Sequence, residues 1–244
     1  MEILITGGNS LIAQAMALDR IRRGDSVILT ASTESRLEKL QSWCCENGAS
    51  CAVFNLLTPE RCSTLDEHFA TVDGLILNAA TRTETLDRFH MLPADEVDAA
   101  IDANIKGNVF LLRKVLPWME QKNFGRIIFI SSVSAAMGTS RYGLYCLHKA
   151  ALEGLILNLA VDYASCNVLA NIVRLGIFRT SRTEQFWKRE KYEKRASSVI
   201  PQGQLGDPGS IPDAIHPLMC ANQYINGTII NISGGLPLMK VPAV

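Results

Sequence analysis

The sequence lacks the features that mark membrane proteins, secreted proteins and nucleic-acid-binding proteins. Its 24 Lys and Arg residues balance its 24 Asp and Glu residues, which gives no support for a nucleic-acid partner or an acidic tail. No run of about 18 apolar residues occurs, so no membrane span is expected. Met1 leads directly into the apolar segment 2–6, without the charged region and apolar core of a signal peptide, and we expect a cytoplasmic protein.

The cysteines form no pattern of disulfide or metal ligands. There are seven, an odd number, and none is arranged as CxxC or with another metal-ligand spacing. Reduced thiols in a reducing compartment are the interpretation that this pattern favours, and no metal site is predicted.

What the sequence does contain is an alternation of short apolar runs with longer helical stretches. The runs are continuously apolar, as is typical of strands buried on both faces of a parallel sheet. Such βαβ repetition predicts one α/β domain over 1–244, with a doubly wound, seven-stranded parallel sheet. The predicted strands are 2–6, 26–30, 51–55, 74–78, 126–131, 168–174 and 228–232. The predicted helices are about 10–23, 34–47, 60–69, 94–121 (ended or bent by Pro117) and 143–164.

Residues 179–213 break this alternation. The segment is too long for a simple connection, and loops of this size are usually lids or binding loops, so we predict a substrate-binding loop. Its first part is basic and contains Phe186, Trp187 and Tyr192. It fits an amphipathic lid over a substrate that bears a phosphate, and it fits equally a solvated helix whose aromatic residues pack on the core.

Two motifs suggest chemistry. The first predicted strand ends in Thr6-Gly7-Gly8, a glycine turn that aims a helix N-terminus at an anion, although such turns also occur for structural reasons alone. Tyr145 and Lys149 are four residues apart and share one face of a helix. The nearby ammonium is expected to lower the pKa of Tyr145 and make it a proton donor near neutral pH.

Placed in order along the chain, these motifs resemble those of the short-chain dehydrogenase/reductase family in its single-domain form. The resemblance implies a three-layer Rossmann fold. The matching positions are Thr6, Gly7, Leu11 and Ala13, then Asn78-Ala79-Ala80, Asn104, Ser132, Tyr145, Lys149, Leu175-Gly176 and the closing segment 228–235.

The resemblance implies catalytic roles for Asn104, Ser132, Tyr145 and Lys149. A hydride would pass between the nicotinamide and a carbonyl or alcohol carbon while Tyr145 transfers the proton. Ser132 would hold the substrate oxygen, and Lys149 would lower the Tyr145 pKa and bind the nicotinamide ribose. Asn104 would hold a water molecule in the proton relay.

Several positions depart from the family pattern around the cofactor. Leu11 replaces a glycine beside the pyrophosphate, and Asn55 stands where an Asp commonly contacts adenine. Ala80 and Leu175 replace a Gly and a Pro that shape the cofactor pocket. These departures concern cofactor affinity and leave the residues predicted for proton transfer unchanged.

The end of the second predicted strand bears on the choice of cofactor. It carries no acidic residue to hold the ribose diol of NAD, and Ser32, Thr33 and Arg36 suit a 2′-phosphate, so NADP(H) is favoured over NAD(H). The full predicted cofactor set is Gly7, Asn9, Ser10, Leu11, Ile12, Ser32, Thr33, Arg36, Asn55, Leu56, Asn78, Ala79, Ala80, Tyr145, Lys149, Gly176, Ile177 and Thr180.

The predicted function is NADP(H)-dependent reduction of a ketone to a secondary alcohol, and the pattern most resembles the 3-oxoacyl-thioester reductase branch. The expected partners are a small carbonyl substrate, carrier-protein- or coenzyme-A-bound forms included, and further copies of the chain. The resemblance implies a homotetramer or dimer assembled through helices 94–121 and 143–164. Alternatives are a non-catalytic nucleotide-binding or partner subunit, an NAD-dependent alcohol dehydrogenase, and an isomerase or dehydratase on this scaffold.

Overall fold

A single parallel sheet of seven strands organises the protein. The computed structural model describes residues 1–82, 84–221 and 224–238. The strand order is β3-β2-β1-β4-β5-β6-β7, so the chain winds outward from β1 to β3 and then back across β1 to β4. The strands are β1 (Glu2–Ile5), β2 (Ser26–Ala31), β3 (Ser50–Val53), β4 (Gly74–Leu77), β5 (Gly125–Ser132), β6 (Val168–Leu175) and β7 (Ile229–Ile232).

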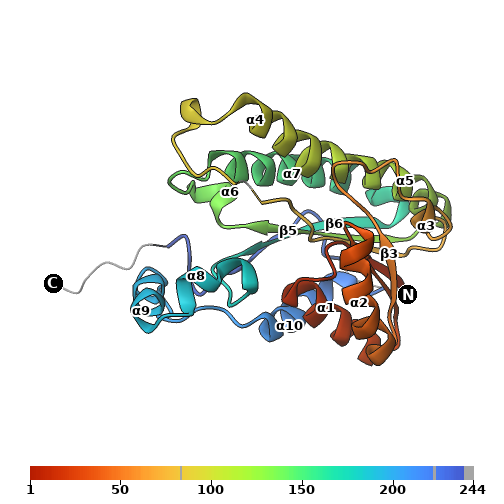
Figure 1. Cartoon of the computed structure of the whole chain (residues 1–244). Helices are drawn as coiled ribbons and strands as arrows, with labels where there is room; N and C mark the ends of the chain where they lie inside the picture. The colour runs from red at the N-terminus through yellow and green to blue at the C-terminus, as the bar shows by residue number, and fades with distance from the viewer. Residues whose placement is uncertain (83, 222–223, 239–244) are drawn as a thin grey trace.

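Helices cover both faces of this sheet, which gives the three layers visible in Figure 1. One layer holds α1 (Leu11–Arg22), α2 (Glu34–Asn47) and α10 (Ile211–Ile215). The other holds α3 (Ser63–Asp66), α4 (Ala94–Ile101), α5 (Gly107–Lys122), α6 (Ser134–Met137) and α7 (Gly143–Asp162). The predicted doubly wound Rossmann fold is confirmed.

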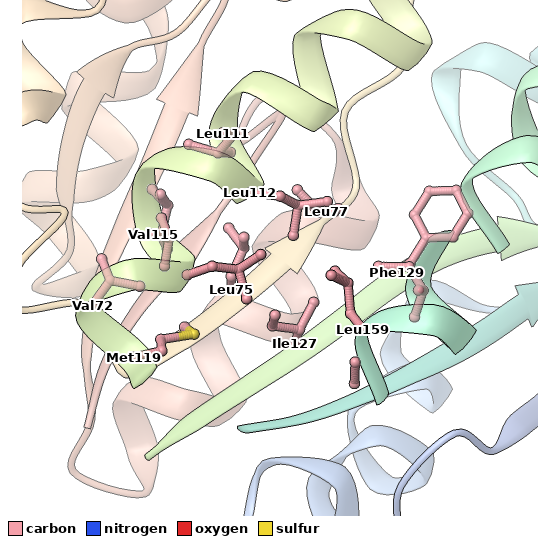
Figure 2. Packing of buried hydrophobic residues seen from close by; sticks show 14 of the residues in the cluster. Val72, Leu75, Leu77, Leu111, Leu112, Val115, Met119, Ile127, Phe129 and Leu159 are labelled. Carbon is pink, nitrogen blue, oxygen red and sulfur yellow. The ribbon is translucent and has the colours of Figure 1, made fainter. Parts of the chain in front are cut away.

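The core lies between the sheet and each helical layer. Every residue of β5 is buried, because helices cover both of its faces. Figure 2 shows the cluster on the α5 and α7 side, where side chains from these two helices pack onto β4 and β5. The labelled members are Val72, Leu75, Leu77, Leu111, Leu112, Val115, Met119, Ile127, Phe129 and Leu159.

Three helix predictions need correction. The segment predicted as 60–69 forms only the short α3. The segment 94–121 is not one regular helix, since a π-helical turn at Asp102–Lys106 separates α4 from α5. Pro117 does not end α5, which continues to Lys122 because Val115, Leu116 and Met119 anchor that part of the helix in the core.

Helix α7 is long and apolar enough to cross a membrane, judged by length and composition alone. Its buried face also carries His148, Lys149 and Glu153, and it packs against β5 and β6. This is the arrangement of a core helix in a globular α/β domain, which meets the same criterion.

The predicted loop 179–213 contains helical structure. It includes α8 (Glu184–Trp187), α9 (Glu190–Ser198) and the start of α10. A parallel bridge between Phe178 and Gly206 ties its two ends together next to the end of β6. Figure 1 shows α8 and α9 set apart from the two helical layers, at one end of the sheet.

Candidate functional site

The candidate site is a pocket of about 130 Å³ at the carboxyl ends of the central strands. Strands β1 and β4 are neighbours there, although the chain leaves β1 in one direction and β4 in the other. A crevice at such a switch point is the usual ligand site of doubly wound sheets. The pocket is lined by Ile12, Asn78, Ala80, Ile130, Ser131, Ser132, Tyr145, Lys149, Leu175, Gly176, Phe178, Thr180, Arg182 and Thr183.

The structure brings three of the predicted catalytic residues together in this pocket. Lys149 is buried, and its Nζ donates a hydrogen bond of 2.8 Å to the carbonyl of Ile130. Ser132, two residues further along β5, lines the same pocket as Tyr145, and its Oγ accepts a hydrogen bond of 3.2 Å from the backbone N–H of Ser134. The Lys149 Nζ lies 5.9 Å from the centre of the Tyr145 ring.

A third contact continues this alignment of α7 with β5. Ser131 Oγ donates a hydrogen bond of 2.6 Å to the carboxylate of Glu153, which lies one helical turn beyond Lys149. Arg174 on β6 donates to both oxygens of the same carboxylate, at 2.8 and 2.6 Å. The Glu153 side chain is therefore fixed by two strands, and it presents negative charge one turn from Lys149.

Burial dominates the acid–base properties of the pair. The pKa of Tyr145 is raised by burial, against the opposing effects of the Ser132 hydrogen bond and the Arg182 charge. The net shift of the Tyr145 pKa is therefore upward, opposite to the predicted direction, and Lys149 is not among the groups that shift it. Burial lowers the pKa of Lys149 to about 7, helped by the charge of Arg182 and opposed by Glu153.

His148 is an unpredicted member of the site. It is buried, and its ring meets the Tyr145 ring edge-on with 5.2 Å between centres. Nδ1 lies 3.0 Å from the carbonyl of Leu144 and must be the protonated nitrogen, because a carbonyl only accepts. Burial, followed by the Lys149 charge, lowers the His148 pKa to about 3, so the imidazole is neutral. No sequence signal marks this residue, since the YxxxK pattern leaves its position open.

Asn104 lies in the π-helical turn and is fully hydrogen-bonded. Its Oδ1 accepts from the backbone N–H of Thr81 at 2.7 Å, and its Nδ2 donates to Thr81 Oγ1 and to the carbonyl of Ala100. Its own carbonyl accepts a hydrogen bond of 2.8 Å from Asn108 Nδ2. The side chain fixes the loop after β4, while the predicted water-holding role stays a prediction.

The turn between β1 and α1 has the geometry of an anion cradle. Gly7 has φ +77°, and a Cβ there would lie 3.2 Å from the Cα of Ala79, so only glycine suits this position. Thr6 Oγ1 accepts the N–H groups of Asn78 and Ala79 at 3.0 and 2.9 Å, which ties the ends of β1 and β4 together. Ser10 caps α1 by accepting from Ala13 N at 3.1 Å.

Leu11, the departure from the family glycine, is 50% exposed at the first position of α1. Its side chain therefore extends from the helix end instead of filling the turn. The free N–H groups and the positive end of the helix dipole suit a diphosphate, so the cradle fits a dinucleotide despite this substitution.

The residues predicted to hold the adenosine end are gathered where β2 ends. Arg36 Nη1 donates to Ser32 Oγ at 3.3 Å, and Asn9 Nδ2 donates to the Arg36 carbonyl at 3.1 Å. Thr33 caps α2 through its side chain. Asn55, which follows β3, accepts the N–H of Leu57 at 3.0 Å, while Leu56 is buried, and the predicted contact of Asn55 with adenine stays a prediction.

The remaining predicted cofactor residues follow β6. Gly176 packs so closely on the end of β7 that a Cβ would lie 2.8 Å from the Cα of Ser233, which is a structural reason for glycine. The carbonyl of Ile177 accepts from Gly206 N at 2.9 Å. Thr180 is buried and caps the following turn with Thr183, and its carbonyl accepts from Trp187 Nε1.

Comparisons with known proteins agree with this geometry. The family model described as enoyl-(acyl carrier protein) reductase matches residues 8–237. The 3-oxoacyl-[acyl-carrier-protein] reductase FabG of Rickettsia prowazekii is 33% identical over 96% of this chain and 95% of its own length. The reductase MabA of Mycobacterium bovis, which bears the same enzyme name, is 29% identical over 96% of this chain and 92% of its own.

Solved structures share the fold over nearly the whole chain. A variant of the actinorhodin polyketide ketoreductase with NADPH superposes with a TM-score of 0.84 at 21% identity, covering 96% of each chain. ElxO with NADP bound gives 0.85 at 24% identity, covering 96% of this chain and 97% of that one.

A doubly wound sheet with a glycine turn at its switch point and a hydroxyl-lined pocket beside it defines a nucleotide-dependent oxidoreductase. The family match over residues 8–237 and the FabG relative make the assignment definite. The chain belongs to the short-chain dehydrogenase/reductase family and resembles its 3-oxoacyl-[acyl-carrier-protein] reductase branch.

Proposed function

We propose that the protein uses NADPH to reduce a ketone to a secondary alcohol, with 3-oxoacyl thioesters as the first substrate class to test. The observation that carries this proposal is the shared pocket of Ser132, Tyr145 and Lys149, next to the β1–α1 turn. The names of FabG and MabA support the substrate class.

When bound, NADPH would supply the hydride for the carbonyl carbon, and the protein's own residues supply the proton for the oxygen. Ser132 Oγ donates a hydrogen bond to the carbonyl oxygen, which stabilises the negative charge that develops there. Tyr145, held next to Ser132, donates its phenolic proton to the same oxygen. Lys149 then stabilises the phenolate while its own position is fixed by the Ile130 carbonyl.

Arg36, Ser32 and Thr33 support NADPH over NADH. The guanidinium of Arg36 lies against Ser32 Oγ at the end of β2, with no carboxylate before Glu34 to repel a 2′-phosphate. ElxO, RhlG of Pseudomonas aeruginosa and the actinorhodin ketoreductase variant were each solved with NADP or NADPH. These likenesses support the same cofactor here.

We also propose a homo-oligomer that works in the cytoplasm on small or carrier-bound carbonyl compounds. Apolar side chains stand exposed on α5 and α7, which favours a helix-to-helix interface between copies. They are Trp118, Leu147, Leu157 and Val161. The seven cysteines are free thiols, as expected in a reducing compartment.

Two measurements test the proposal. NADPH fluorescence during titration should reveal binding, and NADPH consumption should be screened over 3-oxoacyl thioesters, free ketones and quinones. Binding without consumption of any of them would favour a non-catalytic nucleotide-binding subunit. Failure to bind NADPH at millimolar concentration would refute the proposed reductase activity.

A further inference from the structure

Arg182 brings a guanidinium into the pocket that the proposed chemistry does not use. It reaches from the segment after β6, and its Nη2 donates a hydrogen bond of 2.8 Å to the carbonyl of Ala80, in the loop after β4. It lines the same pocket as Ser132, Tyr145 and Lys149. The side chain therefore bridges the two loops that flank the reacting groups.

This guanidinium has no anionic partner among the residues that the structure describes. Arg179, three residues earlier in the same segment, is paired with Glu193. Arg182 forms no ion pair in the described ranges, and only its bond to Ala80 is found among its hydrogen bonds there, while an arginine side chain carries five N–H donors. Most of its donors are thus available to a ligand.

The charges around Arg182 are mainly positive. The residue is exposed in part; burial of the rest lowers its pKa, the phenol of Tyr145 raises the pKa, and the charge of Arg82 lowers it. Lys149 lies in the same pocket, and the Arg182 charge helps to lower its pKa. The described carboxylates close to Arg82, those of Glu84 and Glu96, line a separate cavity, and Glu96 accepts a 2.5 Å hydrogen bond from Thr85 Oγ1.

We propose that Arg182 binds an anionic oxygen group, a carboxylate or a phosphate ester, that the carbonyl substrate carries a few atoms from its reacting carbon. An unpaired guanidinium is the side chain best suited to hold such a group through two hydrogen bonds. The small volume of the pocket places this group close to Tyr145 and Ser132. The inference rests on the proposed ketone reduction and, within it, favours small oxo acids or phosphorylated ketones over 3-oxoacyl thioesters, whose reacting carbonyl stands beside a neutral thioester.

The diphosphate of the cofactor is the other anion near this site. It is expected at the N-terminus of α1, whereas Arg182 is bonded to Ala80 beyond β4. The two sources make different predictions, because loss of a diphosphate contact weakens NADPH binding and loss of a substrate contact does not.

The test compares Arg182→Met with the wild type on two matched pairs of ketones. The first pair is 3-oxobutanoate and ethyl 3-oxobutanoate, and the second is dihydroxyacetone phosphate and dihydroxyacetone. In one pair at least, the ratio of kcat/KM for the anionic over the neutral compound should fall roughly 10- to 100-fold, the effect of losing a charge-assisted hydrogen bond. The pair that responds identifies a carboxylate or a phosphate.

Arg179→Met is the matched control, since it removes an arginine from the same segment but outside the pocket, and it should leave both ratios unchanged. If Arg182→Met raises the NADPH dissociation constant by the same factor by which the kcat/KM ratio falls, Arg182 contacts the cofactor and the inference is overturned. Equal use of charged and neutral ketones by the wild type would overturn it as well, while the proposed reductase activity would stand.

If the wild type binds NADPH but turns over none of the four ketones, the inference is tested by measuring anion binding. Oxalate and inorganic phosphate are titrated calorimetrically into the NADP-loaded protein. Binding of either anion that is lost in Arg182→Met and retained in Arg179→Met supports the inference. Absence of binding, or equal binding in both variants, overturns it.

Discussion

The two walls of the pocket are built by different means. The wall formed by β5 and α7 consists of buried side chains that bond to one another and to the strand, such as Lys149 to the Ile130 carbonyl and Glu153 to Ser131. The wall formed by the β1–α1 turn and the segment after β6 presents backbone N–H groups and exposed side chains, among them Leu11 and Arg182. In this first wall, the proposed proton-transfer wall, Lys149 and Glu153 are already bonded to the strand, whereas the opposite wall has donors left for ligands.

The strongest way to break this comparison is to remove the proposed proton donor. Tyr145→Phe should lower kcat by roughly 1,000-fold or more, since general acid catalysis contributes about 10²- to 10⁴-fold and the phenol also orders the substrate oxygen. The NADPH dissociation constant from fluorescence titration should change little. Turnover close to the wild-type value would contradict the assignment of Tyr145.

The cofactor wall is tested at the adenosine end. Arg36→Ala should raise the NADPH dissociation constant roughly 10-fold or more, because it removes a charged partner of the 2′-phosphate, and should leave NADH binding unchanged. Lys39→Ala, an exposed position on the same helix, is the matched control. Equal losses of affinity for NADPH and NADH would show that Arg36 does not bind the 2′-phosphate.

Glu153→Gln probes the network behind the proton-transfer wall. The Glu153 charge raises the pKa of Lys149, so its removal should move the basic limb of the kcat/KM profile to lower pH. The free energy of unfolding should fall by roughly 1–3 kcal/mol, because Arg174 is left without its partner in a site that is only partly solvated.

Arg174→Met separates the electrostatic effect of Glu153 on Lys149 from a general loss of stability. It leaves the Glu153 charge uncompensated and should move the same limb to higher pH, while the fold is destabilised in both variants. If the basic limbs of the two variants shift in the same direction, or neither shifts, Glu153 only holds the helix in place and does not change the pKa of Lys149.

The smallest expected effect on activity at neutral pH belongs to His148, whose contribution appears instead in acid stability. Its pKa is about 3 in the folded protein and 6.5 as the ordinary value, so the unfolded state binds the proton first and stability falls as pH drops from 6.5 toward 3. His148→Gln should flatten the urea-derived stability profile in that window by up to about 1.4 kcal/mol per pH unit. His90→Gln, at an exposed position, is the control, and an unchanged slope in His148→Gln would contradict the neutral buried state.

The sheet was predictable from sequence because its strands are marked by uninterrupted apolar runs. Each observed strand lies within a residue or so of a predicted run, as with β5 at Gly125–Ser132 against 126–131. The π-helical turn at Asn104 was not predictable, since apolar spacing does not distinguish one extra residue per turn inside a long helix. Pro117 was misjudged because local propensity was outweighed by packing of the α5 core face.

Within the site, the sequence predicted which side chains lie close together but not how deeply they are buried. The spacing of Tyr145 and Lys149 places them on one helical face, yet the direction of the Tyr145 pKa shift depends on burial, which spacing does not reveal. Sequence placed Arg182 only among the basic residues of segment 179–213, and its position in the pocket, bonded to Ala80 102 positions away, is identified by the structure.

Tyr145, Lys149 and Glu153 stand at successive turns of α7, opposite the three consecutive residues Ile130, Ser131 and Ser132 of β5. A slip of the helix by one residue along the strand would separate all three contacts together. The packing of α7 on β5 and the shape of the pocket are therefore coupled, and a substitution that shifts α7 should disturb the Lys149 and Glu153 contacts together.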